Sequence, residues 1–244
     1  MPARDGVVLF PTGTRARVAS AGPETAGPEL VARLGLPVAR ATVVVNGATG
    51  EPRADLADGL ADAIGGVADL AVAHDLTVLT GGTDAGIFSV LGAAMAGRSA
   101  PLVGVVPAGA VTWPGEVGAG PGLEPHHSHF VAVTGDRWGD ETPTLLALAA
   151  ALGARAPSAA VVVGGGACTR DEARGHLRAG RPVLVVAGSG GVADELAAAM
   201  AAPGGRPDAR SSSSAPLVAC PIEGGRPAVR AALAALLGLA DGGP

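Results

Sequence analysis

The sequence predicts an α/β fold in which a doubly wound, mainly parallel sheet lies between two helical layers in a three-layer αβα arrangement. Short β-branched runs alternate with glycine-rich turns and with Ala/Leu-rich stretches of helical spacing. The strand-like runs are continuously apolar rather than alternating, which is typical of parallel strands covered on both faces. Repeated strand–turn–helix units of this kind indicate a Rossmann-like single domain.

The expected elements follow the chain in a regular order. β-Branched runs predict strands at residues 7–10, 43–45, 77–80, 102–106, 130–133, 161–163, 183–186 and 217–219. Apolar residues at three- and four-residue steps predict helices near residues 29–34, 56–70, 86–96, 141–152, 169–179, 191–201 and 227–237. The Gly- and Pro-rich connection 107–128 is long enough to be either functional or mobile.

All of these elements are expected to belong to one domain. Residues 1–41 form an N-terminal extension packed on it, and residues 42–202 form its core. Residues 203–216, with four consecutive serines, are expected to be a flexible linker. Residues 217–244 then supply a last strand and helix that complete the same domain.

Composition excludes several classes of function. The 244 residues contain 17 Arg, no Lys and 22 acidic side chains, for a net charge of −5, which argues against nucleic acid as a partner. Apolar runs are too short for membrane insertion, and no secretory signal is seen. Two cysteines, at 168 and 220, fit neither a zinc spacing nor a disulfide framework, so we expect a reducing cytoplasm, no metal and no cofactor. Ala/Leu-rich helix faces, such as residues 145–152, suggest a homo-oligomer.

Four glycine-rich loops follow predicted strands, at residues 46–50, 81–86, 164–166 and 188–191. Ligands of open parallel sheets bind beyond the carboxyl ends of the strands, where glycine permits close approach and helix amides favour anions. One such loop is equally compatible with a tight turn that binds nothing, but four together favour a phosphate-bearing small molecule. The absence of Lys excludes a P-loop. The Gly164–Gly166 turn lacks the G-x-G-x-x-G spacing, which argues against an ordinary NAD dehydrogenase.

Five sequence blocks occur in an order found in a known family. They are Thr80–Gly86, Gly104–Pro107, His127–Phe130, Arg137–Glu141 and Gly188–Asp194. In that order they resemble the N-terminal cytosolic domain of melastatin-type TRP channels (LSDAT type), within the SLOG superfamily that also contains the Lonely Guy phosphoribohydrolases. The resemblance covers about residues 42–202 and implies a Rossmann-like nucleotide-binding core. It further implies a ligand-sensing function, with an ADP-ribose-like nucleotide derivative as the leading ligand.

The resemblance also implies which residues contact the ligand. They are Asn46, Gly47, Ala48, Gly81, Gly82, Thr83, Gly86, His127, Ser128, Gly164, Gly165, Gly166, Thr169, Gly188, Ser189 and Gly190. A branched side chain at Gly165 is expected to block the phosphate without unfolding the domain. The sequence departs from the channel pattern at His126, at Thr134 and at Gly191, where the family commonly has an anion-binding Arg.

An enzymatic alternative comes from another branch of the superfamily. Residues 164–172 resemble the phosphoribohydrolase motif P-G-G-x-G-T-x-x-E, with Gly164 in place of the Pro and Cys168 in place of the third Gly. That resemblance implies a nucleoside-monophosphate phosphoribohydrolase in which Glu172 and Arg137 are catalytic. Alternatively, Glu172 is simply an acid favoured by the dipole at a helix start. We favour ligand sensing because few titratable groups flank the loops, and an interaction scaffold with an empty pocket is a third possibility.

The remaining polar and aromatic residues leave further alternatives open. Three histidines, at 126, 127 and 129, are more consistent with hydrogen bonding than with metal ligation, since no third ligand shares their face. Cys168 fits a small buried filler better than a reactive thiolate. Trp113 and Trp138 are the only large rings able to stack on a base, although Trp138 also suits an anchoring role.

Overall fold

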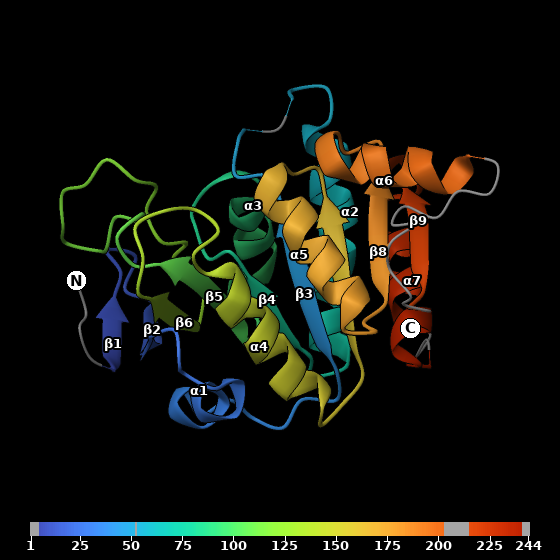
Figure 1. Ribbon diagram of the computed structural model, residues 1–244. Coiled ribbons are helices and arrows are strands. Elements are labelled where there is room, and N and C mark those ends of the chain that lie inside the picture. The colour runs from blue at the N-terminus through green and yellow to red at the C-terminus, as the bar shows by residue number, and fades with distance from the viewer. Residues whose placement is uncertain (1–4, 52, 203–214, 241–244) are drawn as a thin grey trace.

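The computed structural model of the chain describes residues 5–51, 53–202 and 215–240, and its centre is a nine-stranded sheet (Figure 1). The strands are β1 (Gly6–Leu9), β2 (Arg15–Ala21), β3 (Thr42–Gly47), β4 (Thr77–Thr80), β5 (Leu102–Pro107), β6 (His129–Val133), β7 (Ser158–Val163), β8 (Val183–Ala187) and β9 (Leu217–Pro221). The helices are α1 (Gly27–Leu34), α2 (Ala57–Ala73), α3 (Gly86–Met95), α4 (Thr142–Gly153), α5 (Ala167–Arg178), α6 (Gly191–Ala201) and α7 (Gly225–Leu237), with a short 3-10 turn at Ile222–Gly224. The doubly wound α/β prediction is confirmed.

The predicted strands and helices all form, but the sequence reading missed β2. This strand pairs in parallel with β6 and antiparallel with β1. Its residues alternate between exposed Arg15 and Arg17 and buried Ala16 and Val18. Further along the strand, Ala19 and Ala21 are buried as well. The two arginines interrupt the apolar run, and the strand prediction depended on continuous apolar runs.

The two faces of the sheet carry separate cores. Along β3, Val43 and Val45 pack toward α2, α3 and α7, whereas Val44 points to the opposite face. Helices α1, α4, α5 and α6 cover that second face, and Figure 1 shows them in front of the strands. Because both faces are covered, the central strands β4 and β5 bury every side chain, whereas the edge strands β1 and β9 remain partly exposed.

The long connection between β5 and β6 is packed rather than open. Trp113 and Leu123 from this segment lie with Phe130 of β6 in a third apolar cluster. The indole N–H of Trp113 donates to the carbonyl oxygen of Ala108 at 3.1 Å, and the ring is buried. Trp113 is therefore part of the core and is not available to stack on a ligand, which corrects that expectation.

The two ends of the chain extend the same sheet on opposite sides. β1 and β2 join it beyond β6, and β9 joins it beyond β8. The expected linker lies outside the described residues up to position 214, and the structure resumes at Ala215. Among the described residues, no helix is both long and apolar enough to cross a membrane.

The strand order creates a crevice between β3 and β7. The chain builds β3, β4, β5 and β6 outward in one direction and then returns to place β7 on the other side of β3. The loops after β3 and β7 therefore diverge to opposite faces, and ligands of open α/β sheets bind at such a point. β3 ends at Asn46–Gly47, and β7 ends at Val163 directly before the Gly164–Gly166 turn.

Gly86 holds the start of α3 against the loop that follows β3. Its φ is +53°, and a Cβ here would collide with the carbonyl oxygen of Ala48. The next amide, of Ile87, donates to that same oxygen at 3.0 Å. Any residue but glycine would push the two loops apart.

We expect Gly86→Ala to destabilise the protein more than the matched variant Gly97→Ala. Gly97 also has a positive φ, of +70°, but open space surrounds its missing Cβ. Gly97→Ala should therefore cost only the backbone strain, about 1 kcal/mol. Gly86→Ala should cost about 1–3 kcal/mol more because of the collision with Ala48. Urea unfolding of both variants measures the difference, and equal losses would show that the close approach is relaxed without cost.

Candidate functional site

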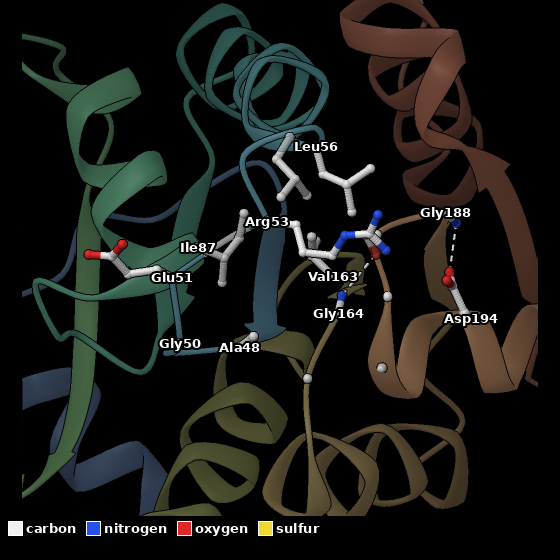
Figure 2. A pocket seen from close by; sticks show the side chains of 15 residues that line it. Ala48, Gly50, Glu51, Arg53, Leu56, Ile87, Val163, Gly164, Gly188 and Asp194 are labelled. Atoms are coloured by element: carbon white, nitrogen blue, oxygen red, sulfur yellow. Dashed lines mark hydrogen bonds between the residues drawn. The ribbon is translucent and has the colours of Figure 1, made fainter.

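Two adjoining cavities open at the β3/β7 crevice. The first, here called the arginine cavity, has a volume of about 340 Å³. It is lined by Ala48, Gly50, Glu51, Arg53, Leu56, Leu60, Ile87, Val163, Gly164, Gly165, Gly188, Ser189, Gly190, Gly191 and Asp194. Figure 2 shows the Arg53 side chain extending across this cavity from the loop that follows β3.

The second cavity, here called the glutamate cavity, has a volume of about 250 Å³. It is lined by Gly47, Ala48, Thr49, Gly81, Phe88, Trp138, Glu141, Gly166, Ala167, Cys168, Thr169 and Glu172. Ala48 borders both cavities, and the Gly164–Gly166 turn continues from one to the other. The two cavities are thus neighbouring compartments of one site.

The start of α5 supplies unpaired backbone donors to this site. Gly166 is the residue before the helix, and Ala167, Cys168 and Thr169 form its first turn and line the glutamate cavity. Within the described chain, the amides of these three first-turn residues have no hydrogen-bond acceptor. Free amides at a helix start, together with the helix dipole, favour an anion.

The start of α6 differs, because the amides of Val192 and Ala193 in its first turn already have acceptors within the protein. Val192 and Ala193 donate to the carbonyl oxygens of Gly165 and Gly164, each at 3.0 Å. The Gly188 amide donates to the Asp194 carboxylate at 2.6 Å (Figure 2). These three amides are therefore not available to a phosphate, although the implied contacts Gly188, Ser189 and Gly190 line the arginine cavity. The loop instead ties α6 to the Gly164–Gly166 turn.

Arg53 is a site residue that the sequence reading missed. Its guanidinium pairs with Asp55 at 2.6 Å, and both side chains are well exposed. An exposed pair of this kind contributes little free energy, so the guanidinium keeps donors for a second anion. This chain has Gly191 where the channel pattern commonly has an Arg, and Arg53 lines the same cavity as Gly191. The available signal was an Arg just after the first glycine-rich loop and before the next helix.

Glu172 is the most strongly perturbed acid of the site. It is 8% exposed, and Asn46 Nδ2 donates to its Oε2 at 2.9 Å. Burial, with a contribution from the nearby Glu141 carboxylate, raises the pKa of Glu172 to about 7. A buried acid that lines a cavity and has a pKa near neutrality is a candidate functional residue, so Glu172 is a candidate here.

Two further ionisable groups lie beside Glu172. Burial also raises the pKa of Glu141, whose Oε2 accepts the amide hydrogen of Gly139 at 2.8 Å. Burial and the neighbouring carboxylates of Glu141 and Glu172 raise the pKa of the Cys168 thiol. Cys168 is therefore kept as a neutral thiol rather than as a reactive thiolate, but it is half-buried and lines the glutamate cavity, so it is not a buried filler.

Most of the ligand-contacting residues implied by the resemblance do line the cavities. They are Gly47, Ala48, Gly81, Gly164, Gly165, Gly166, Thr169, Gly188, Ser189 and Gly190. Trp138 also lines the glutamate cavity and is 44% exposed, so it is available to stack on a ligand. Arg137, by contrast, is exposed and lines neither cavity.

Six of the implied contacts lie behind the cavity walls. Gly82, Thr83, Gly86, Asn46, His127 and Ser128 line neither cavity. Thr83 is fully buried, and Asn46 is 1% exposed with both polar ends of its side chain bonded to protein.

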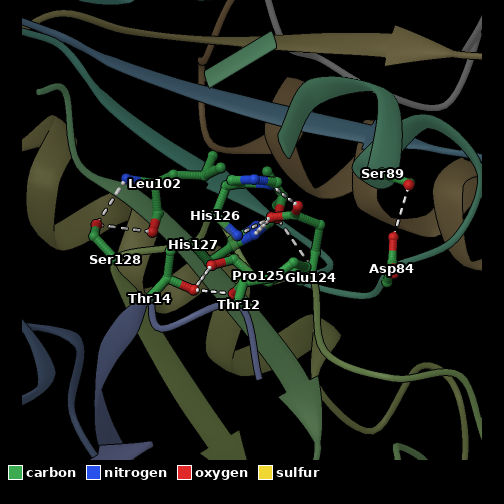
Figure 3. A network of polar contacts seen from close by, with 12 residues as sticks. Thr12, Thr14, Asp84, Ser89, Leu102, Glu124, Pro125, His126, His127 and Ser128 are labelled. Atoms are coloured by element: carbon green, nitrogen blue, oxygen red, sulfur yellow. Dashed lines mark hydrogen bonds and ion pairs between the residues drawn. The ribbon is translucent and has the colours of Figure 1, made fainter. Parts of the chain in front are cut away.

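His127 belongs to a buried network beneath the Gly81–Gly82 turn (Figure 3). Its Nδ1 lies 2.7 Å from the Glu124 carboxylate, and its Nε2 lies 2.7 Å from Thr80 Oγ1. Thr80 Oγ1 in turn accepts the Gly82 amide hydrogen at 2.9 Å. Ser128 bonds to the backbone of Leu102. His127 therefore supports the loop from behind, whereas Ser128 ties the start of β6 to the start of β5.

Gly165 is less tolerant than the sequence suggested. Its φ is +96°, and a Cβ would lie 2.5 Å from the Thr169 side chain. A branched residue there would distort the turn itself, so loss of binding would not isolate the ligand contact. Gly166 is the better probe, because its φ is −120° and nothing lies within 4 Å of the position that a Cβ would take.

No metal centre is seen in the described ranges, where no three His, Cys, Asp or Glu side chains gather as ligands. The nearest approach to one is the cluster of Glu124 with His126 and His127, in which two imidazoles share a carboxylate. Burial acts to raise the pKa of Glu124, but hydrogen bonds from His127 and His126 lower it overall. The imidazoles thus act as hydrogen-bonding partners of the acid.

Comparison with known proteins identifies the fold and its relatives. The model of a family described as "SLOG in TRPM, prokaryote" matches residues 40–224. Among solved structures, the X-ray structure of TM1055, a target of the Northeast Structural Genomics Consortium, has a TM-score of 0.52 and 22% sequence identity, and covers 75% of this chain and 94% of that chain. At this identity the likeness shows the fold alone. No curated protein sequence matches the chain.

The raised pKa of Glu172 predicts a pH-dependent stability that Glu172→Gln removes. Between the usual value of 4.5 and about 7, the folded state keeps a proton that the unfolded state has lost. The contribution is therefore complete below pH 4.5 and disappears as the pH rises through 7. Relative to Glu172→Gln, the wild-type free energy of unfolding should fall by about 3 kcal/mol between pH 4.5 and 8.

Urea unfolding of both proteins across this range measures the effect. Burial, together with the Arg181 charge, lowers the pKa of His176 to about 3, but this group is present in both proteins and cancels in the comparison. A difference that does not change with pH would mean that the pKa of Glu172 is the same in the folded and unfolded states.

Proposed function

Since the chain belongs to the SLOG family, in its group described as SLOG in TRPM, prokaryote, we propose that it binds a phosphorylated nucleoside derivative across the arginine and glutamate cavities. The family assignment supports a nucleotide-related domain. The observation that carries the proposal is the set of free amides at the start of α5, which line the glutamate cavity directly beside a second cavity that contains a cation, Arg53. An ADP-ribose-like molecule has the matching division into phosphates and nucleoside.

The charges of the two cavities favour one orientation of the ligand. Arg53 is the lining cation of the arginine cavity, although Glu51 and Asp194 also border it. The glutamate cavity has two lining acids and no lining cation. We therefore place the phosphate groups in the arginine cavity and at the Gly164–Gly166 turn that continues from one cavity to the other, away from Glu141 and Glu172, which would repel them.

The nucleoside then occupies the glutamate cavity. Trp138 and Phe88 supply aromatic surface there, and base–aromatic stacking is worth about 1–3 kcal/mol. Both cavities are close to the lower end of the size range of small-molecule sites, about 300 Å³. A ligand that fills one of them alone would gain only part of the available contact, which favours a molecule that spans both.

We place ligand sensing ahead of turnover because the expected catalytic pair is incomplete. Glu172 lines the glutamate cavity, but the Arg137 side chain is exposed and does not. No lining cation is present in the glutamate cavity, so it offers no positively charged side chain to a departing ribose phosphate.

Hydrolysis of an N-glycosidic bond is the second candidate, and one observation favours it. The pKa of Glu172 is raised to about 7 by burial and by Glu141, which suits a group that must both hold and release a proton near neutral pH. A general acid or base of this kind acts on a bound nucleoside only if it lies within hydrogen-bond reach of the reacting atom.

The binding proposal is tested with Gly166→Val. The new side chain fits the backbone but covers the free amides at the start of α5. We expect affinity for ADP-ribose or AMP to fall by about tenfold or more, equivalent to about 1.4 kcal/mol. For the wild type, ligand at 100 times its Kd should add about 2.7 kcal/mol to the free energy of unfolding, visible as a thermal shift.

Gly22→Val is the matched control for this experiment. Gly22 likewise has open space around its missing Cβ, and it lines neither cavity. Its variant should bind as the wild type does. Equal affinity of Gly166→Val and Gly22→Val for the nucleotides would place the phosphate elsewhere.

Turnover is tested by incubating the purified protein with AMP and with ADP-ribose and measuring released base and ribose phosphate by chromatography. The sensing proposal predicts that both nucleotides remain intact. Release that disappears in Glu172→Gln would instead establish the hydrolase and assign the reaction to Glu172. Release that persists in Glu172→Gln would point to a contaminating activity.

A further inference from the structure

Behind Glu172 a line of buried polar side chains crosses the layer between β3 and α5. Arg181 Nη1 lies 2.6 Å from His176 Nδ1, and His176 Nε2 lies 2.9 Å from Asn46 Oδ1. Asn46 Nδ2 lies 2.9 Å from Glu172 Oε2. Arg181 follows the carboxyl end of α5, and Glu172 lies near its amino end, so the line runs along the helix that Figure 1 shows in front of β3.

The direction of every hydrogen bond in this line is determined by its first member. A guanidinium can only donate, so His176 Nδ1 must accept. In the neutral imidazole the proton is then on Nε2, which donates to Asn46 Oδ1. Asn46 Nδ2 is left to donate to Glu172 Oε2. The tautomer of His176 and the orientation of the Asn46 amide both follow from Arg181.

We propose that Asn46, His176 and Arg181 are positioning residues that reserve Oε2 of Glu172 as a permanent acceptor, so that Oε1 is the oxygen that gains and loses the proton and donates Oε1–H to the bound ligand. The donor part of this inference rests on the proposed function, whereas the positioning part does not. The ligand atom that it requires is an uncharged acceptor of the nucleoside, such as a ring nitrogen, a carbonyl oxygen or a ribose oxygen.

The surroundings of Oε1 leave it free for this role. Among the residues that the structure describes, its one partner is the Thr142 hydroxyl, at 3.5 Å, which is the limit of a hydrogen bond. The acid side chains that face Glu172 are Glu141, from the start of α4, and Asp171, from α5, and both disfavour its ionised form. The Cys168 thiol and the His176 imidazole are uncharged near neutral pH, and β3 contributes only Asn46.

Arg181 is suited to anchor the line because it has little freedom. It is 5% exposed, and its Nε donates to Ser158 Oγ at 3.1 Å. No carboxylate pairs with it within the described residues. The carboxyl end of α5 partly offsets its charge, since cations are favoured there. A carboxylate in the place of the Arg181 guanidinium would accept a hydrogen bond, and His176 would then carry its proton on Nδ1 instead of Nε2.

The test follows Glu172 without any ligand, by ¹³C NMR of side-chain carboxyl carbons in glutamate-labelled protein. The resonance of Glu172 is assigned by its loss in Glu172→Gln. In the wild type it should titrate near pH 7. The Asn46 amide donates to Oε2 and so stabilises the ionised form of Glu172. Asn46→Leu removes this donor and should raise the titration midpoint by about one pH unit.

The role of His176 is tested by a conservative rescue. His176→Leu breaks the line and should raise the midpoint in the same direction. His176→Gln can accept from Arg181 through its oxygen and donate to Asn46 through its nitrogen, so it should restore the wild-type midpoint. His127→Gln, in the separate Glu124 network, is the matched control and should leave it unchanged.

An unmoved midpoint in both Asn46→Leu and His176→Leu would overturn the positioning role. If His176→Leu does not fold, Asn46→Leu and His176→Gln decide the question, because a simple packing role predicts that Gln shifts the midpoint as well. This result does not depend on whether a nucleotide binds, so it stands apart from the proposed function.

The donor role is measured separately with ADP-ribose. If only protonated Glu172 binds, the affinity of the wild type relative to Glu172→Gln should fall about tenfold between pH 6 and 8. A ratio that does not change with pH would overturn donation from Oε1. Absence of any nucleotide binding would overturn both this donation and the proposed function, while the titration result would remain.

Discussion

The reversal of strand order between β3 and β7 is the constraint from which the site follows. It brings the loops after two neighbouring strands to opposite faces and leaves a crevice that the start of α5 closes. Several backbone segments must pass through this small region at close range. Gly47 therefore lies against the Val163 carbonyl oxygen, and Gly191 lies against the backbone of Gly165, where no side chain fits.

This crowding gives many glycines of the glycine-rich loops a structural role rather than a role in ligand contact. Many of these glycines exist so that backbone can approach backbone, and the resulting hydrogen bonds consume the amides at the start of α6. The first turn of α5 is where donors remain open to solvent. The net charge of −5 also gives no long-range attraction for an anion, so affinity must come from these local donors and from Arg53.

The protein uses two buried glutamates in opposite ways. Glu124 receives donors from two histidines and a backbone amide, which keep its pKa low and make it a permanent support of the Gly81–Gly82 turn. Glu172 receives one close donor, faces another acid, and has a pKa near 7. Burial disfavours the charged form of both, and the number of donors decides which remains ionised.

The sequence by itself determined the fold class, nearly every helix and strand, and the loops that border the site. It did so because continuous apolar runs, glycine turns and helical spacing are local signals. β2 was missed because Arg15 and Arg17 interrupt its apolar pattern, so it offers no continuous apolar run.

Only the tertiary structure decided which loop residues reach the ligand. Asn46 and His127 are implied contacts that instead support the walls, whereas Arg53 and Glu141 line the cavities without having been implied as contacts. Hydrogen bonds such as that from Asn46 to Glu172 join residues far apart in the chain. Their partners, and the pKa values that depend on burial, exist only once the strands and helices have packed.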